Sequence, residues 1–344
     1  MTPPLVLAID GGNSKTDLAL VRADGEVLSL VRGPQSSPQH LGVDGCLRVL
    51  DDLLEQALRD ARLPNGRTPV AAVGQLLMAG VDFPAEEEEL YAAAVPRGLA
   101  ERISVANDTF AVLRAGTEKG WGVAVVCGAG INCVGVGPAG RHARFPALGE
   151  ITGDWGGGLD VGLAGLSAAA RSEDGRGQKT SLEHAVPLHF GLDTPSAVGE
   201  AIHRADIARS RVVELAPVVL AEAEKDPVAG SILDRLAEEV VALVRVALGR
   251  LELTAAPVEV LLGGGLTRSV DGRLIRAVEA RLAEVAPAAT VHATSSPPIV
   301  GAALLGLDEL QASPEAQSRL RREIGDLVAR IEGGRKEARS WNDA

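Results

Sequence analysis

The sequence predicts an α/β protein built from two related domains, and three observations carry this prediction. An apolar run at residues 5–10 leads through a glycine-rich polar turn into a second apolar run at residues 18–21. Residues 121–137 repeat this order of strand, glycine turn and strand. With 344 residues, 46% of them hydrophobic, the chain is long enough to build two domains with separate cores.

The first glycine turn follows an acidic residue, Asp10, at the end of the first predicted strand. Glycines let a backbone approach a ligand closely and point its N–H groups at an anion. Ser14, Lys15 and Thr16 add hydroxyl groups and a cation beside the turn. Asp10 is placed to hold a hydrated divalent metal, so the segment suits the phosphates of a magnesium nucleotide.

A P-loop is the obvious alternative, and the sequence excludes it. Walker A requires a glycine directly before the lysine, where Ser14 stands, and a helix after the loop. Here residues 17–22, a turn at 23–26 and residues 27–31 predict a β-meander instead. An ordinary glycine-rich hairpin without a ligand remains open from this segment alone.

Two later glycine clusters extend the pattern. Gly128 and Gly130 lie in the turn of the second hairpin, and Gly263, Gly264 and Gly265 follow an apolar strand at residues 258–262. Three successive glycines suit a flat ligand, such as a base and ribose, against the backbone. A Rossmann interpretation lacks the full G-x-G-x-x-G opening a helix with a later acidic residue.

Composition and charge exclude several classes of function. The net charge of −12 argues against a nucleic-acid partner, because no basic stripe would neutralise phosphates. Three cysteines without a CxxC give neither a disulfide framework nor a zinc pattern, and Cys127 and Cys133 suit buried thiols. Residues 121–140 are uncharged, yet glycines and Asn132 favour a buried hairpin over a membrane span. Without a signal-peptide pattern, we expect a cytoplasmic protein with no membrane partner.

Five segments in order resemble the BadF/BadG/BcrA/BcrD ATPase family, and within it the N-acetylglucosamine and glucosamine kinases. They are residues 10–16, 106–109, 128–133, 149–154 and 263–265, within a resemblance that spans residues 5–310. The resemblance implies two actin-like ATPase (ribonuclease H-like) domains with an interdomain nucleotide and substrate cleft. It implies ATP and Mg²⁺ as cofactors, a sugar as small-molecule substrate and a homodimer.

The same resemblance implies the domain boundaries. The N-terminal actin-like domain is expected at residues 1–107, with a C-terminal helix at 308–344 returning to it. The second domain is expected at residues 108–307, interrupted by a helical insertion at 159–253. Within this insertion, residues 226–253 show apolar positions at helical spacing.

Asp108 is the candidate catalytic base, since phosphoryl transfer needs a group to accept the proton of the attacking hydroxyl. It follows a predicted strand and precedes a predicted helix, so an N-cap is the competing interpretation. The family resemblance favours the base, and it implies that Asp10 holds Mg²⁺ through water. The residues expected to bind ATP are Gly11, Gly12, Asn13, Ser14, Lys15, Thr16, Gly128, Ala129, Gly130, Gly263, Gly264 and Gly265.

The resemblance also implies a sugar-binding set, with Glu150 and Asp154 as carboxylate acceptors for hydroxyl groups. The expected substrate-binding residues are Ser36, Ser37, Asn107, Asp108, Ile131, Asn132, Gly149, Glu150 and Asp154. Several positions depart from the mammalian-type N-acetylglucosamine kinases. Ser37 stands where these carry an asparagine, and Ala129 and Ile131 stand where they carry a threonine and a serine. Their Trp-Gly-His is replaced by Leu148, Gly149 and Glu150.

The sequence therefore predicts an ATP-dependent amino-sugar kinase that phosphorylates N-acetylglucosamine or glucosamine at the 6-hydroxyl. Three alternatives stay open: an ATPase of the 2-hydroxyacyl-CoA dehydratase or benzoyl-CoA reductase activator type, a kinase of another sugar such as glucose or N-acetylmuramate, and a non-enzymatic sugar sensor. The helical insertion and the lack of a suitable exposed cysteine argue against the activator. The lack of a helix-turn-helix segment before residue 5 argues against the sensor.

Overall fold

A computed structural model describes residues 3–64, 66, 68–268 and 272–342 of the chain. The chain divides into two compact units: unit 1 comprises Met1–Gly120 and Ser296–Ala344, and unit 2 comprises Trp121–Ser295. The boundaries expected at residues 107/108 and 307/308 differ from this division. The reason is that α3 (Thr109–Gly116) and α11 (Pro298–Glu309) pack on each other and on strands of the first sheet.

The sheet of unit 1 begins with the predicted meander. Its strands are β1 (Leu5–Gly11), β2 (Thr16–Arg22), β3 (Val27–Gly33), β4 (Ala71–Met78) and β5 (Ala100–Asn107), in the spatial order β3-β2-β1-β4-β5. The first three strands are antiparallel, whereas β4 and β5 run parallel to β1. Parallel pairing needs crossover connections, which here carry helices.

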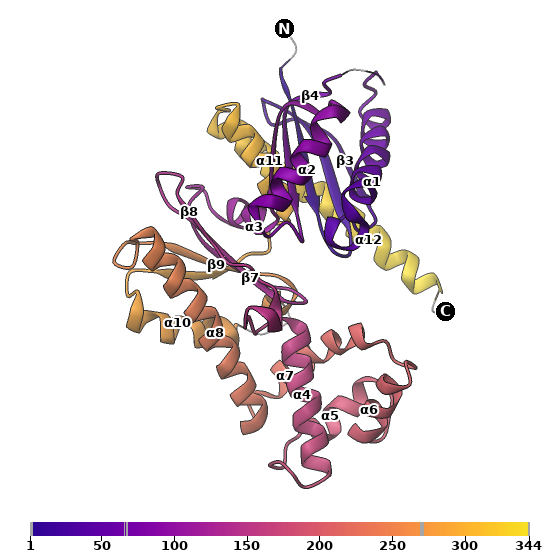
Figure 1. The fold of residues 1–344 in the computed structure, drawn as a ribbon, viewed down its shortest axis with the longest axis vertical. Coiled ribbons are helices and arrows are strands. Elements are labelled where there is room, and N and C mark those ends of the chain that lie inside the picture. The colour runs from indigo at the N-terminus through magenta and orange to yellow at the C-terminus, as the bar shows by residue number, and fades with distance from the viewer. Residues whose placement is uncertain (1–2, 65, 67, 269–271, 343–344) are drawn as a thin grey trace. The chain divides into compact units, whose positions relative to one another are not determined.

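Both faces of this sheet are buried, because successive side chains of a strand alternate between its two faces. Leu7 and Ile9 of β1 join the core beneath α1 (Pro38–Asp60) and α2 (Pro84–Ala94). Val6 and Ala8 join a second core with α3, α11 and α12 (Pro314–Asn342). Figure 1 shows α11 and α12 returning to the N-terminal sheet.

The sheet of unit 2 has the same topology as the first. Its strands are β6 (Gly122–Cys127), β7 (Ile131–Val136), β8 (His142–Arg144), β9 (Glu259–Gly263) and β10 (Thr290–Ala293), in the spatial order β10-β9-β6-β7-β8. Strands β6, β7 and β8 are antiparallel, and β9 and β10 run parallel to β6. The two sheets confirm the α/β class and the duplication that the sequence predicts.

Helices fill the expected insertion between β8 and β9. They are α4 (Gly158–Glu173), α5 (Leu182–His189), α6 (Pro195–His203), α7 (Leu215–Glu222) and α8 (Pro227–Leu251). After β9 come α9 (Gly265–Arg268) and α10 (Arg273–Val285). Short 3₁₀ turns occur at Val95–Arg97, Gly149–Ile151 and Arg209–Glu214. The core of this unit packs the sheet against α4, α7, α8 and α10.

The described part of the C-terminal helix lies in unit 1. Glu323 of α12 accepts a hydrogen bond from the backbone N–H of Val27 at 2.9 Å. Arg114 of α3 forms a two-point ion pair with Asp308, with N–O distances of 2.6 and 2.9 Å. Residues 1–2 and 343–344 of the expected N-terminal domain lie outside the described residues.

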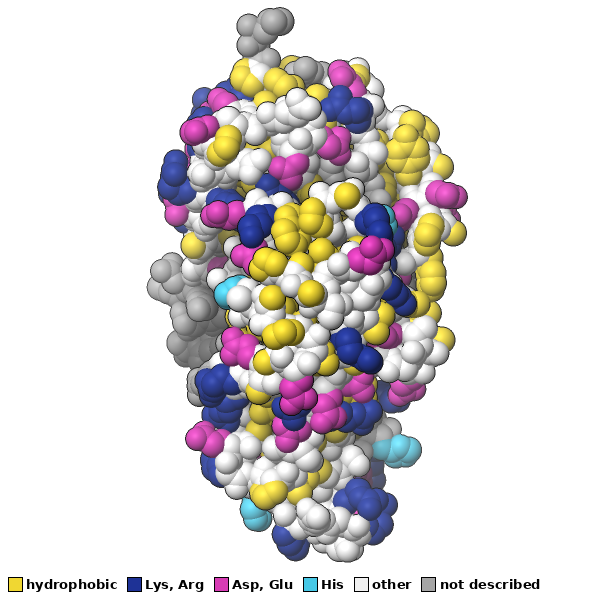
Figure 2. Space-filling model, turned by 90° about the vertical axis from the view of Figure 1, so that its left-hand side faces the viewer, with side chains coloured by type: hydrophobic (Ala, Val, Ile, Leu, Met, Phe, Trp, Pro, Cys, Tyr) yellow, Lys and Arg dark blue, Asp and Glu magenta, His cyan; other side chains and the backbone are white. Residues whose placement is uncertain are grey.

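The surface carries charges of both signs. On the face that Figure 2 shows, Lys and Arg side chains lie among Asp and Glu side chains. Across the described ranges, no helix has the length and apolar character that crossing a bilayer requires.

Candidate active site

The carboxyl ends of three parallel strands meet at one edge of the unit 1 sheet. Pairing places Gly11 beside Met78, and Met78 beside Asn107. Asp10 precedes this row on β1, and Asp108 follows it after β5. Ligands of open α/β sheets bind outside such carboxyl ends. The fold therefore brings the two candidate acidic residues of unit 1 to the same edge.

Asp10 is a buried carboxyl group whose surroundings disfavour its charged form. Its side chain is 9% exposed and forms no hydrogen bond or ion pair with any described residue. Burial, followed by the negative charges of Asp108 and Asp17, raises the pKa of Asp10 to about 8. Lys15 and Arg32 oppose this shift only in part. A buried carboxylate without a partner is costly unless a cation joins it, so the position fits a bound metal.

The neighbouring Asp17 has a partner of its own. It is 1% exposed and lies opposite Asp10 in the β1–β2 pairing. Arg32 of β3 donates two hydrogen bonds to its carboxylate, at 2.5 and 2.8 Å, and the Lys15 ammonium lies 3.5 Å away. Arg32 is therefore committed to Asp17, whereas Lys15 is partly exposed next to the turn.

The glycine turn between β1 and β2 is tightly built. The N–H of Gly12 donates to the carbonyl of Lys15 at 2.9 Å, and the turn exposes Asn13 and Ser14. A Cβ on Gly11 would lie 2.3 Å from the Met78 side chain and 2.7 Å from Ser36 Oγ. The absence of a side chain at Gly11 is therefore a packing requirement as well as a way to expose the backbone.

The two serines expected to bind sugar lie inside unit 1. Ser36 and Ser37 are fully buried, and Ser36 Oγ accepts a hydrogen bond from Thr16 Oγ1 at 2.7 Å. Ser37 Oγ has no hydrogen-bond partner among the described residues, and a Cβ on Gly80 would lie 2.7 Å from it. Neither hydroxyl reaches the surface of this structure.

Asp108 precedes α3, but its side chain does not cap that helix. The amide of Thr109 donates instead to Asn107 Oδ1 at 3.0 Å, so Asn107 has the capping role. Burial, followed by the negative charge of Asp82, raises the pKa of Asp108 to about 6, although nearby amides of Thr109 and Asp108 oppose the shift. The interpretation that Asp108 caps α3 is therefore wrong, because the side chain that accepts from the first turn is that of the preceding residue, Asn107.

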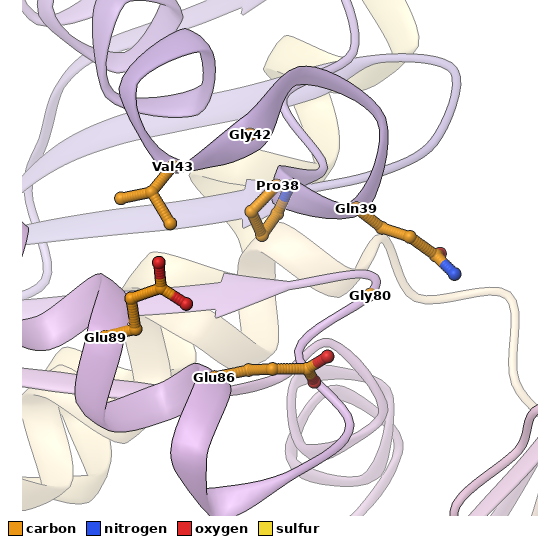
Figure 3. Close-up of a pocket in the computed structure, with 7 residues that line it drawn as sticks. All are labelled: Pro38, Gln39, Gly42, Val43, Gly80, Glu86 and Glu89. Atoms are coloured by element: carbon orange, nitrogen blue, oxygen red, sulfur yellow. The ribbon is translucent and has the colours of Figure 1, made fainter.

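A small pocket of about 180 Å³ lies next to Gly80, between the first turn of α1 and α2. Figure 3 shows Pro38, Gln39 and Val43 from α1 and the carboxylates of Glu86 and Glu89 from α2 around it. Glu86 is engaged, because its carboxylate accepts hydrogen bonds from the backbone N–H groups of Asp82 and Phe83 at 2.7 and 2.9 Å. The pocket therefore borders the segment that carries Asp82.

In unit 2, three glycine segments converge at the carboxyl edge of its sheet. The N–H groups of Gly158 and Leu159 donate to the carbonyls of Gly128 and Ala129, at 2.8 and 3.0 Å. A Cβ on Gly157 would lie 2.2 Å from Gly130 Cα, and one on Gly264 would lie 2.2 Å from the Cys127 carbonyl oxygen. The start of α4 and the residues after β9 thus pack directly on the β6–β7 turn, which exposes Ala129 and Gly130.

The expected sugar loop of unit 2 is a compact turn. The carbonyl of Gly149 accepts hydrogen bonds from the amides of Gly153 and Asp154 at 2.8 and 3.0 Å. Thr152 Oγ1 donates to Asp154, and Glu150 is exposed. Beside the β6–β7 turn, Asn132 accepts a hydrogen bond from the amide of Cys133 at 2.7 Å, and Ile131 is 5% exposed within the core of unit 2.

Metal binding would depend on few protein ligands. Among the residues that the structure describes, no three His, Cys, Asp or Glu side chains gather in a metal-binding arrangement. Mg²⁺ commonly keeps several waters and takes only one or two carboxylates, with substrate phosphates completing its shell. The single carboxylate of Asp10 beside an open glycine turn fits that mode of binding.

Comparison with known proteins now identifies the family. The sequence pattern of the BadF/BadG/BcrA/BcrD ATPase family matches residues 7–306. The chain belongs to this family. The match covers both sheets and every glycine segment described above, so the expected family is confirmed.

Proteins to which this chain is similar include named sugar kinases. The chain is 29% identical over 268 residues to an N-acetylmuramic acid/N-acetylglucosamine kinase of Clostridium acetobutylicum, covering 77% of this chain and 86% of that protein. It is 26% identical over 320 residues to an N-acetyl-D-glucosamine kinase of Dictyostelium discoideum, covering 90% and 99%. A solved structure from Chromobacterium violaceum, described as a candidate N-acetylglucosamine kinase, superimposes with a TM-score of 0.67 at 24% identity, covering 88% and 99%.

Sequence reasoning missed several residues of this family member. Asp17 and Arg32 are a buried ion pair, and the signal was a charged residue inside each of two apolar strands. Gly157 supports the β6–β7 turn, and the signal was the run of three glycines at 156–158. Asp82 lies beside Asp108 in space but 26 positions away in sequence, and no local pattern marked it.

Proposed function

We propose that this protein is an ATP-dependent amino-sugar kinase that transfers the γ-phosphoryl group to the 6-hydroxyl of N-acetylglucosamine or glucosamine. The observation that carries the proposal is the pair Asp10 and Asp108. Both are carboxylates with raised pKa values at the carboxyl edge of one sheet, next to an open glycine turn. Carboxylates whose pKa values are raised by burial and by a neighbouring negative charge are typical of functional sites.

Asp108 suits the role of general base. With a pKa of about 6 it is mostly ionised near pH 7.5, and it is basic enough to accept a proton as the acceptor oxygen attacks. The sugar oxygen gains the phosphoryl group, the bond from the γ-phosphorus to the bridging oxygen breaks, and ADP leaves with that electron pair. The hydroxyl proton passes to Asp108 and then to solvent.

Asp10 would hold Mg²⁺ through water, and the metal would supply charge neutralisation for the nucleotide phosphates. Lys15, partly exposed and 3.5 Å from Asp17, supplies a further positive charge beside the turn. We assign ATP binding to the expected residues of the three glycine segments. Gly157 and Gly158 serve these segments by supporting the β6–β7 turn.

For the sugar, we assign hydroxyl recognition to Glu150 and Asp154, whose carboxylates accept hydrogen bonds and tolerate a protonated 2-amino group. The named activities of the Clostridium and Dictyostelium relatives favour N-acetylglucosamine over glucosamine. Mg²⁺ dependence, a homodimeric assembly and cytoplasmic action belong to the same proposal. Light scattering on the purified protein tests the assembly, and omission of Mg²⁺ tests the metal.

The activator alternative requires cysteines that can reach a shared cluster. The three cysteines of the chain, Cys46, Cys127 and Cys133, are all buried as free thiols. Burial also raises the pKa of Cys46 and Cys127 to about 12, as is typical of structural rather than reactive thiols. This observation favours the sugar kinase.

One coupled assay tests the proposal. ADP release is followed with ATP and Mg²⁺ in the presence of N-acetylglucosamine, glucosamine, glucose and N-acetylmuramate, and kcat/KM is compared among them. We expect N-acetylglucosamine to lead, with glucosamine within about tenfold, since one lost hydrogen bond changes discrimination by roughly 1–3 kcal/mol. Glucose leading by tenfold, or ADP release without stimulation by any sugar, would overturn the proposal.

A further inference from the structure

The start of α3 poses a problem for a base at position 108. The first amides of a helix need acceptors, and an aspartate there would normally accept from them. A carboxylate used in that way is less able to accept a proton from a substrate, because the same lone pairs and orientation are committed. In this structure the Thr109 amide and the Thr109 hydroxyl both donate to Asn107 Oδ1, at 3.0 and 2.6 Å.

Asn107 performs this role only in one orientation of its side-chain amide. Rotating the amide by half a turn would bring Nδ2, a donor, against the N–H of Thr109, which is also a donor. The orientation is set by Asp82, whose Oδ1 accepts a hydrogen bond from Asn107 Nδ2 at 2.8 Å. An ionised carboxylate only accepts hydrogen bonds, so it holds the nitrogen on its own side.

Asp82 is itself held by the start of the preceding helix. Its backbone N–H donates to the carboxylate of Glu86 at 2.7 Å, together with that of Phe83 at 2.9 Å. Figure 3 shows Glu86 on α2 extending toward the segment after Gly80. A chain of hydrogen bonds therefore runs from α2 through Asp82 and Asn107 to the first turn of α3.

We propose that Asp82 and Asn107 are positioning residues that cap α3 in place of Asp108 and so keep its carboxylate free for the acceptor hydroxyl. The proposal rests on the proposed kinase function, in which Asp108 is the base. It explains why an asparagine directly precedes the catalytic aspartate in this chain. It also explains why Asn107, which is 3% exposed, has its side-chain oxygen and nitrogen both bonded within unit 1.

A stability experiment tests the cap without any assay of activity. The variants Asn107→Ala, Asp108→Ala and the double variant are unfolded in urea. We expect a small fall in midpoint for Asn107→Ala, because the Asp108 carboxylate, whose pKa the nearby Thr109 amide already lowers, then replaces Asn107 as the acceptor for that amide. We expect no fall for Asp108→Ala. The double variant should fall by more than the sum of the two. Additive midpoints would overturn the proposal even if no sugar substrate is found.

A kinetic experiment tests the consequence for catalysis. Asp82→Ala frees Asn107, so we expect kcat to fall on the order of 10- to 100-fold with little change in the KM for ATP, as misplacement of a reacting group does. Asp82→Asn keeps an acceptor oxygen for Asn107 and should retain kcat within about threefold at pH 7.5, since the removed charge alone acts over a longer range.

Asp226→Ala is the matched control. Asp226 caps α8 of unit 2, accepting from the Ala229 amide at 2.8 Å, and it also binds Thr180 and Ser181. This variant should lower the unfolding midpoint while the folded fraction keeps its kcat. An Asp82→Ala enzyme with unchanged kcat per folded molecule, or an Asp82→Asn enzyme as impaired as Asp82→Ala, would contradict the proposal. A wild type without sugar kinase activity would refute the proposed function alone.

Discussion

The two sheets share one topology but differ in the chemistry of their first hairpins. In unit 1 the residues one step before the turn are Asp10 and Asp17, and in unit 2 the residues in the same pairing position are Val126 and Asn132. Lys15 and Arg32 add charge in unit 1, whereas residues 121–140 of unit 2 carry none. The same backbone frame therefore supports a charged site in one unit and an uncharged, glycine-lined one in the other.

The difference teaches that topology and chemistry are specified by separate residues. Apolar runs mark the strands in both units, since a strand with helices on both sides of its sheet buries its side chains on both faces. The few positions at the carboxyl edge can then vary, because they lie beyond the packed core. In unit 1 they gather carboxylates with raised pKa values, and in unit 2 they allow backbone segments to approach each other closely.

Replacing the base of unit 1 should have the largest effect on activity. We expect Asp108→Asn to lower kcat by roughly 10²–10⁴-fold with a nearly unchanged KM for ATP, because proton abstraction is lost and the nucleotide contacts remain. The unfolding midpoint should not fall, since Asp108 does not cap α3. Steady-state kinetics and thermal unfolding of the same samples distinguish a base from a helix cap. A loss of stability with an unchanged kcat would show that Asp108 caps α3 and is not the base.

Neutralising Asp10 should lower Mg²⁺-dependent turnover by roughly 10²–10³-fold, as removal of one electrostatic group in an active site commonly does. It should also change stability in a pH-dependent way. The folded-state pKa of about 8 exceeds the usual value, so the metal-free wild type loses stability as pH rises from about 4 to about 8.

Asp10→Asn should abolish that loss, and Mg²⁺ added to the wild type at pH 8 should offset it. Thermal unfolding across this pH range, with and without Mg²⁺, measures both effects. If the stability of the wild type and that of Asp10→Asn change with pH in the same way, Asp10 does not titrate as the structure indicates.

A methyl group on Gly157 should act on unit 2 through packing alone. The added Cβ would lie 2.2 Å from Gly130 Cα, so the start of α4 or the β6–β7 turn must shift, at a cost of roughly 1–3 kcal/mol. We expect Gly157→Ala to lower the urea midpoint and to raise the KM for ATP. Gly249→Ala, on α8 with nothing within 4 Å of the added atom, is the control and should leave the KM unchanged without lowering the midpoint, because alanine favours a helix over glycine. Equal behaviour of the two variants would show that the close approach has no role.

The smallest effect should be a shift in the pH profile. Because the negative charge of Asp82 contributes to the raised pKa of Asp108, Asp82→Asn should move the acidic limb of kcat/KM for the sugar to lower pH, by less than about one unit. The charged groups that bear on Asp108 are Asp82 and, across the strand row, Asp10. Glu55→Gln, which removes an exposed carboxylate of α1, should leave the limb in place. If the acidic limb of Asp82→Asn lies at the same pH as that of the wild type, the charge of Asp82 does not contribute to the pKa of Asp108.

Much of the fold was predictable because its signals are local. The expected strand at residues 5–10 is found as Leu5–Gly11, and the expected helix at 226–253 as Pro227–Leu251. Strand β8 was missed, since its three residues are too few to show a period. The first turn of α1 was not predicted either, because Gly42, with a φ of 67°, interrupts the helical backbone within α1.

The candidate site was predictable only in part. Asp10, Asp108 and the glycine clusters stand out in sequence because each follows an apolar strand. The partners that determine their chemistry do not, since Arg32 pairs with Asp17 from the neighbouring strand and Asp82, after β4, bonds Asn107 at the end of β5. The assigned roles of the sugar loop, Ser36 and Ser37 stay predictions.

The sequence by itself determined the succession of strands along the chain, the duplication and the positions where the chain turns, because apolar runs and glycine act over a few neighbouring residues. Only the tertiary structure decided which carboxylates are buried without a counter-charge and which amides are already satisfied. Those properties depend on atoms brought together from distant segments, and burial and Coulomb forces act through space rather than along the chain. Asp108 is the plainest case: its neighbours in sequence suggest a helix cap, whereas Asn107 and Asp82 in space make it available as a base.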